Sequence, residues 1–157
     1  MHQGAFQQEP VIYDTTYRDK RIQQEIDERA GKPFGFLQRL RMKGIGSPRM
    51  HIRSASPEIQ ERLCQKFNLK HCNLELRRRA VIVWFGSFAR TFAWVIPYPE
   101  LSMVKNGVQL TIYGGGHFMN VADAHGGQID HEFFGKLLEF KAEQLLTSFE
   151  ARGRKQA

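Results

Sequence analysis

The chain has 157 residues, 41% hydrophobic and 11% aromatic, which fits one domain with a true core and some chain left for arms. Six prolines and fourteen glycines are too few for a low-complexity protein. The two cysteines, Cys64 and Cys72, lie eight positions apart, which matches neither zinc-ligand spacing nor a disulfide framework. The first 15 residues lack a secretory pattern, so we expect a cytoplasmic protein with reduced thiols.

The net charge of +7 is unevenly distributed along the chain. Residues 1–17 carry two acids and no base, and residues 18–79 carry 16 bases and 7 acids. Residues 80–157 are neutral, with 7 of each. Positive charge confined to one half of a chain indicates a polyanionic partner.

The N-terminal half contains few strong structural signals. Residues 1–16 show no periodicity and are predicted to be disordered. Thr16 as a cap, with Asp19 three positions on, predicts a polar helix that ends at Gly31. Its apolar face is so short that we expect it to be marginal alone and to order on a partner. Residues 32–53 hold six bases, no acid and interleaved apolar residues, with at most two helical turns near 36–43.

Clearer elements follow. Ser56 as a cap with Pro57 at the first helical position predicts a helix to about Asn68. Residues 80–85 and 88–96 form two apolar runs, and Gly86-Ser87 between them fits a type II′ hairpin. Residues 101–105, 108–113 and 117–121 are three further strands. Asn106-Gly107 predicts a type I′ turn, and three glycines at 114–116 predict another turn. Five successive strands indicate an antiparallel meander.

A long amphipathic helix is predicted from its cap, Asp130, to about Glu150, followed by a basic tail. Residues 80–96, which follow Arg77-Arg78-Arg79, have a rival interpretation as a membrane span. The run is short for about 30 Å of hydrocarbon and contains Arg90, so we favour the hairpin.

We therefore predict an α+β fold in which a curved antiparallel meander of five or six strands packs against the C-terminal helix. The predicted division is a basic arm over 1–55 with one marginal helix, an α+β domain over 56–150 and a tail over 151–157. The hairpins at Gly86-Ser87 and Asn106-Gly107 and the helix from Asp130 resemble, over about residues 71–150, a pleckstrin-homology-like barrel. That resemblance implies a module that docks a ligand rather than an enzyme.

The candidate site is basic and partly aromatic. Phosphates attract Lys and Arg, and aromatic rings stack on unpaired bases. In a strand, Arg77 and Arg79 would share one face. Phe34 and Phe36 are the candidates for stacking or insertion. The candidate polyanion-binding residues are Lys32, Arg39, Arg41, Lys43, Arg49, Arg53, Arg77 and Arg79.

Two alternatives stay open for this segment. Phe34, Phe36, Leu37 and Leu40 would either dock the arm onto the sheet or dip into an anionic membrane. No enzyme signature accompanies them. His117, His125 and His131 lack metal-ligand spacing, and the three glycines at 114–116 lack the residues of a phosphate loop. We expect no cofactor, no metal and no small-molecule substrate.

The sequence thus favours a non-catalytic binding module whose partner is a polyanion, with nucleic acid ahead of an anionic membrane surface. The alternative is a protein-interaction or assembly component. In that case residues 1–55 would order on a partner subunit or on a second copy of the chain.

Overall fold

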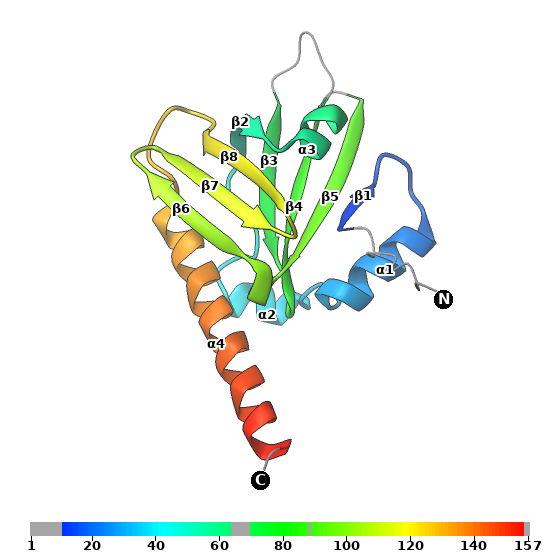
Figure 1. Ribbon diagram of the computed structural model, residues 1–157, viewed down its shortest axis with the longest axis vertical. Helices are drawn as coiled ribbons and strands as arrows, with labels where there is room; N and C mark the ends of the chain where they lie inside the picture. Colours follow the sequence, from blue (N-terminus) through cyan, green and yellow to red (C-terminus); the bar gives the residue numbers. More distant parts are fainter. Residues whose placement is uncertain (1–10, 64–69, 88, 156–157) are drawn as a thin grey trace, which may run out of the picture.

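An eight-stranded antiparallel sheet forms the centre of the computed structural model, which describes residues 11–63, 70–87 and 89–155 (Figure 1). The strands are β1 (Ile12–Asp14), β2 (Met50–Ala55), β3 (His71–Leu76), β4 (Ala80–Ser87), β5 (Arg90–Pro97), β6 (Ser102–Asn106), β7 (Gln109–Gly114) and β8 (His117–Asp123). They pair in the open order β1-β5-β4-β3-β2-β8-β7-β6. The predicted α+β class, antiparallel sheet and long C-terminal helix are confirmed. The predicted count of five or six strands is too low, and a closed barrel is not confirmed.

The helices are α1 (Lys20–Ala30), α2 (Phe36–Arg41), α3 (Pro57–Arg62), the 3-10 turn η1 (Tyr98–Glu100) and α4 (His131–Lys155). The predicted cap of α4 is confirmed, because the Asp130 carboxylate accepts from the backbone N–H of Glu132 at 2.9 Å. Gly31 ends α1 as predicted, with φ of 90°. Asp19, rather than Thr16, caps the start of α1. The start of α3 at Pro57 is confirmed, and the predicted continuation through residues 64–69, which include Cys64, lies outside the described residues.

Apolar side chains cover both faces of the central strands. On one face, Val83 and Trp94 belong to the main core, which α4 completes with Leu137. On the other face, Ile26 of α1 packs with Ile82 in a second cluster. Burial on both faces explains the unbroken apolar run of residues 80–96, which forms the hairpin β4–β5. Within the described part of the chain, no helix has the length and apolar character needed to cross a membrane.

The sheet curls so far that strands distant in its order touch. A Cβ on Gly114, at the end of β7, would lie 2.4 Å from Cγ2 of Ile96 on β5. Trp94 of β5 likewise meets the ring of His117 on β8 edge-on, with 6.4 Å between the ring centroids. The absence of a side chain at Gly114 is therefore a condition for closing the main core.

The turns differ from prediction in their register. Gly86 and Ser87 belong to β4 and pair with Thr91 and Arg90, so they are strand residues and not the predicted turn. Phe88 lies outside the described residues. Asn106 pairs with Gln109, which leaves Gly107-Val108 as the loop. Only Gly107 of these two has positive φ, which fits type II′ rather than the predicted type I′. Side chains that must face the core set the register, and the turn residues adapt to it.

Three elements of the predicted N-terminal arm take part in the fold. β1 pairs with β5, and β2 lies between β3 and β8. Helix α1, which we expected to order on a partner, packs on β4 and β5 through Ile26 and Ala30. Residues 1–10 lie outside the described residues.

A buried arginine joins α1 to the sheet. The side chain of Arg77 is 3% exposed, and its guanidinium donates to the carboxylate of Asp27 on α1 at 3.0 Å and to the carbonyl of Gly31 at 2.8 Å. It also pairs with the carboxylate of Glu75 on β3. The hydroxyl of Tyr98, from η1, donates to the carbonyl of Arg77 itself. Helix α1, the end of β3 and η1 therefore meet at this residue.

We predict that Arg77→Ala lowers the free energy of unfolding by about 3 kcal/mol, because it leaves two carboxylates and a carbonyl without their donor. The neighbouring Arg78→Ala is the matched control, since Arg78 is exposed, and should cost less than about 1 kcal/mol. Urea unfolding of the two variants measures the difference. Equal losses would contradict the role assigned to Arg77.

Candidate nucleic-acid interface

The three consecutive arginines form the turn between β3 and β4. The N–H of Arg77 donates to the carbonyl of Ala80 at 3.0 Å, so this segment is a tight turn and not the strand that was predicted. Arg77 points inward, while Arg78 and Arg79 are exposed. Arg79 donates to the carbonyl of Glu28, in the last turn of α1, at 2.6 Å. The turn therefore presents two guanidinium groups next to the end of α1.

Around these two arginines lies a groove of about 870 Å³ between α1 and α2. We call it the basic groove and define it by Lys20, Lys32, Gln38, Arg78 and Arg79, which all line it. The guanidinium of Arg78 lies 5.6 Å from the centroid of the Phe34 ring and donates to Gln38 Oε1 at 3.4 Å.

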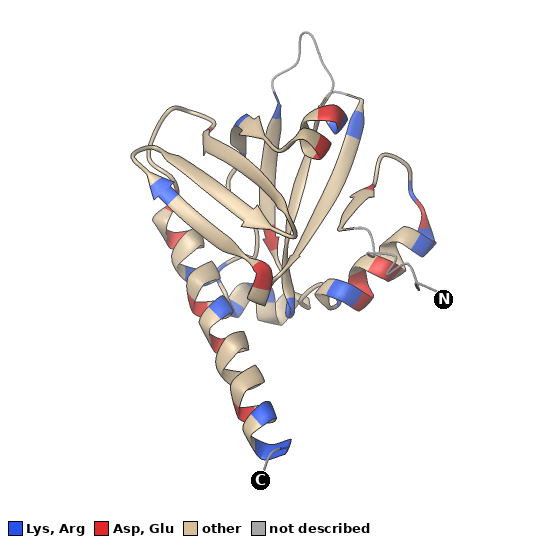
Figure 2. Ribbon diagram, viewed as in Figure 1, with Lys and Arg blue, Asp and Glu red and all other residues tan. Residues whose placement is uncertain are grey.

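Two acidic residues, Asp27 and Glu28, also line the groove. The carboxylate of Asp27 is paired with Arg77, which offsets its charge. Figure 2 shows that the strands carry few charges and that charged residues gather on the helices and at strand ends. Apart from Asp27, the groove is lined by four basic residues and one acid, Glu28, so its net charge is positive.

Helix α2 stands beside the groove with most of its side chains in solvent. Phe36, Leu37 and Leu40 are 70%, 69% and 61% exposed. Two contacts with α4 hold the segment in place. Phe34 meets Phe140 edge-on at 5.8 Å, and Lys136 Nζ donates to the carbonyls of residues 42–44 at 3.1–3.2 Å. These carbonyls follow the last turn of α2, so the Lys136 ammonium fixes the chain where the helix ends.

The structure sorts the predicted basic residues into groups. Lys32 and Arg79 line the basic groove, Arg39 and Arg41 are exposed on the adjacent α2, and Lys43 follows that helix. Arg77 is buried against two carboxylates, so its prediction as a polyanion contact is wrong, and Arg78 lines the groove instead.

Arg49 and Arg53 lie elsewhere. Residues 50 and 51 of β2 pair with residues 72 and 71 of β3, at the end opposite the turn at 77–79. A six-residue strand spans roughly 20 Å. Arg53 is therefore far from the groove, although both belong to one basic stretch of sequence.

The two phenylalanines predicted to stack or insert also have different environments in the structure. Phe36 is exposed on α2 and remains a candidate for stacking or insertion. Phe34 is only 5% exposed, between Phe140 and the guanidinium of Arg78. Its prediction as a stacking residue is wrong, because its ring already has neighbours that exclude a base.

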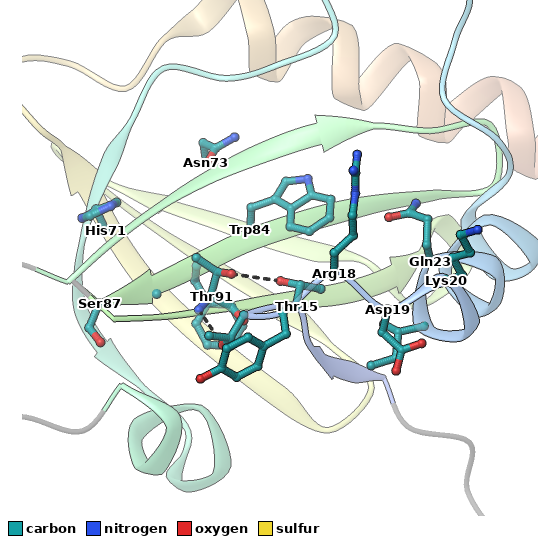
Figure 3. A pocket seen from close by; sticks show the side chains of 15 residues that line it. Thr15, Arg18, Asp19, Lys20, Gln23, His71, Asn73, Trp84, Ser87 and Thr91 are labelled. Atoms are coloured by element: carbon teal, nitrogen blue, oxygen red, sulfur yellow. Dashed lines mark hydrogen bonds between the residues drawn. The ribbon is translucent and has the colours of Figure 1, made fainter.

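A second cavity, of about 900 Å³, lies on the outer face of β3, β4 and β5 beside the start of α1 (Figure 3). We call it the Trp84 recess, because the half-buried indole of Trp84 lies among its lining residues. Figure 3 shows the indole between Asn73 of β3 and Arg18, which precedes α1. Thr15 Oγ1 donates to Thr91 Oγ1 at 3.3 Å and closes one side.

The sequence reasoning missed this recess. Its one signal is the position of Trp84, whose side chain faces away from the main core while its neighbours Val83 and Phe85 belong to it. The other walls come from α1 and the segment that precedes it, from β3 and from β5, which no local pattern brings together. Lys20 and Gln23 line both cavities, so the basic groove and the Trp84 recess adjoin along α1.

His117, His125 and His131 have separate partners in the structure. His117 Nε2 lies 3.5 Å from a carboxylate oxygen of Glu58, and His131 Nε2 lies 3.4 Å from Lys105 Nζ. The backbone N–H of His125 donates to Asp123, whose pKa is lowered by this bond and by another from Gly127. Across residues 11–63, 70–87 and 89–155, no three His, Cys, Asp or Glu are placed to hold a metal.

Cys72 is a buried free thiol. Burial raises the pKa of its thiol to about 12, so the reactive thiolate is not formed at neutral pH.

Asp14 holds the chain at the side of the recess. Hydrogen bonds from the side chain and the backbone N–H of Thr16, together with the Arg90 guanidinium at 2.7 Å, lower the pKa of Asp14 from 3.8 to about 2. Since the folded-state pKa is below the unfolded value, the stabilisation is complete above about pH 4 and is lost as the pH falls towards 2.

We predict that Asp14→Asn lowers the free energy of unfolding at pH 5 by about 0.5–1 kcal/mol, a small value because the pair is exposed and screened. The difference from the unmodified chain should fall to a small fraction of that value at pH 2, where Asp14 is about half protonated in the folded chain. Urea unfolding of both proteins between pH 5 and pH 2 measures it. A difference that is constant over this range would rule out the ionised carboxylate as the cause.

The chain matches no family model, no curated protein and no solved structure. Its function must therefore be inferred from the basic groove and the Trp84 recess themselves.

Proposed function

We propose that this protein is a non-catalytic module that binds nucleic acid through the basic groove. One observation carries the proposal: Lys32, Arg78 and Arg79, from distant parts of the sequence, meet around a single groove and are all exposed. Arg39 and Arg41 on α2 extend the positive surface beside it. Cations gathered in this way suit a chain of phosphates, whose binding releases condensed counterions.

The two arginines of the turn are positioned before any ligand arrives. Arg79 is fixed by its bond to the carbonyl of Glu28, and Arg78 by the Phe34 ring and by Gln38. A guanidinium has five N–H donors, so donors remain on each side chain for phosphate oxygens. Side chains that are already ordered lose less conformational freedom on binding, which favours affinity.

An anionic membrane surface is the second candidate, and the exposed apolar side chains of α2 favour it. Phe36, Leu37 and Leu40 would enter the lipid boundary while Arg39 and Arg41 contact headgroups. Helix α2 has six residues, so the apolar area that it can insert is small. We therefore rank it below nucleic acid.

An assembly role remains the third candidate. It requires the N-terminal segment to order on another subunit, whereas β1, α1 and β2 already contact this chain's own sheet. Because of that internal packing, we rank the assembly role third.

We predict that the affinity for a short single-stranded DNA falls linearly on a log–log plot against salt concentration. Arg78→Ala and Arg79→Ala should each reduce the slope by about 0.7–0.9, the loss of one phosphate contact. Fluorescence anisotropy of a labelled oligonucleotide measures both quantities.

The control is Arg53→Ala, which removes an exposed arginine at the far end of β3 and should leave the slope unchanged. An affinity that does not respond to salt, or equal losses at Arg53 and Arg78, would reject the basic groove. Sedimentation with phosphatidylserine vesicles, together with no binding of DNA, would establish the second candidate instead.

A further inference from the structure

We propose that the Trp84 recess accepts one unpaired base of a single strand whose phosphates run along the basic groove. The inference rests on the proposed function and adds to it the class of ligand, a single strand rather than a duplex. It is carried by the composition of the recess and by its continuity with the groove.

The first argument is the indole itself. Trp84 lies on the outer face of β4, half-buried, and packs at its inner side against the cluster under α1. It is therefore held in place by the sheet while it also lines the recess. A fixed aromatic ring that a ligand can reach is the arrangement on which nucleic-acid bases stack, and such stacking tolerates every base.

The second argument is the polar lining. The recess contains the amide of Asn73 and the hydroxyls of Ser87 and Thr91. Amides and hydroxyls both donate and accept hydrogen bonds, so they suit the mixed edges of a base. A purely apolar ligand would leave the Asn73 amide and the Ser87 hydroxyl without partners when they are covered, which is costly.

The third argument is the charge at the rim. Arg18 and Lys20 are exposed beside the recess, and neither forms an ion pair with a described residue. Asp19, between them, is occupied in capping α1 through the N–H of Arg21 at 2.8 Å. Two cations next to the Trp84 indole suit a nucleotide, because its base can stack on the indole while its phosphate contacts the cations.

The fourth argument is continuity. Lys20 and Gln23 line both cavities. The sugar–phosphate backbone of a strand can therefore follow α1 from Arg78 and Arg79 to Arg18. Eleven helical residues cover about 16 Å. In a duplex the bases stay stacked and paired, and none can enter the recess without being unpaired at a cost of free energy. The geometry therefore selects single strands.

The test uses the natural fluorescence of the chain, which has two tryptophans. Trp94 is fully buried, so a ligand in the recess should quench Trp84 alone. The full chain is titrated with a single-stranded DNA of about 12 nucleotides, with the same backbone carrying abasic sites, with the matching duplex and with a free nucleoside monophosphate. We expect the intact strand to quench the fluorescence and to bind roughly 10-fold or more tightly than the abasic strand or the duplex.

Variants locate the effect. Trp84→Ala should abolish the preference for the intact strand and leave the abasic affinity unchanged. Trp84→Phe, which keeps a smaller ring and protects the fold, should lose only a few-fold. Trp94→Phe should retain the quenching. Retained quenching in Trp84→Phe would place the effect at Trp94 and overturn the inference.

The outcomes separate this inference from the proposed function. If intact, abasic and duplex DNA bind equally and without quenching, the recess takes no base, while the basic groove stands. If none of them binds, the proposed function itself fails. If the free nucleotide binds as tightly as the strand, the recess serves a small molecule, and the inference about single strands is wrong.

Discussion

The position of α1 depends on the buried guanidinium of Arg77, and much else in the structure depends on α1. A charged group that is almost fully enclosed must be paired, because water no longer solvates it. Arg77 meets that demand with carboxylates from α1 and β3 and with the carbonyl that ends α1. The helix is thereby fixed over the outer face of β4 and β5. Both cavities use α1 as a wall, so one ion-pair network shapes the whole candidate surface.

Local sequence signals correctly located the helix ends that depend only on neighbouring residues. The cap at Asp130, the Pro57 start and the Gly31 end are each set by one or two residues, and all three are confirmed. Strands β1 and β2 were missed, because one has three residues and the other mixes polar and apolar side chains. Their place in the sheet comes from partners far away in the chain. The turns shifted for the same reason, since the core chooses the register.

The sequence predicted that the candidate site is positively charged, but it did not predict how the residues of the site are arranged. The excess of bases over residues 18–79 pointed to this region, and Lys32 and Arg79 do line one groove. The exchange of Arg77 for Arg78 could not be foreseen, because a turn does not alternate its side chains as a strand does. Phe34 and Phe36 look alike in sequence, yet Phe140 and the Arg78 side chain cover only the first. The Trp84 recess needs four elements at once, and no pattern along the chain encodes it.

The open order of the sheet also has a consequence for solubility. A sheet that does not close ends in two edges, whose backbone groups can recruit strands from other molecules and start aggregation. In this fold one edge strand, β1, has three residues, and the other, β6, has five and includes the exposed Lys105. Short and charged edges are poor templates for such growth. The protein can thus leave part of its outer sheet face exposed without offering a long, flat edge to its own copies.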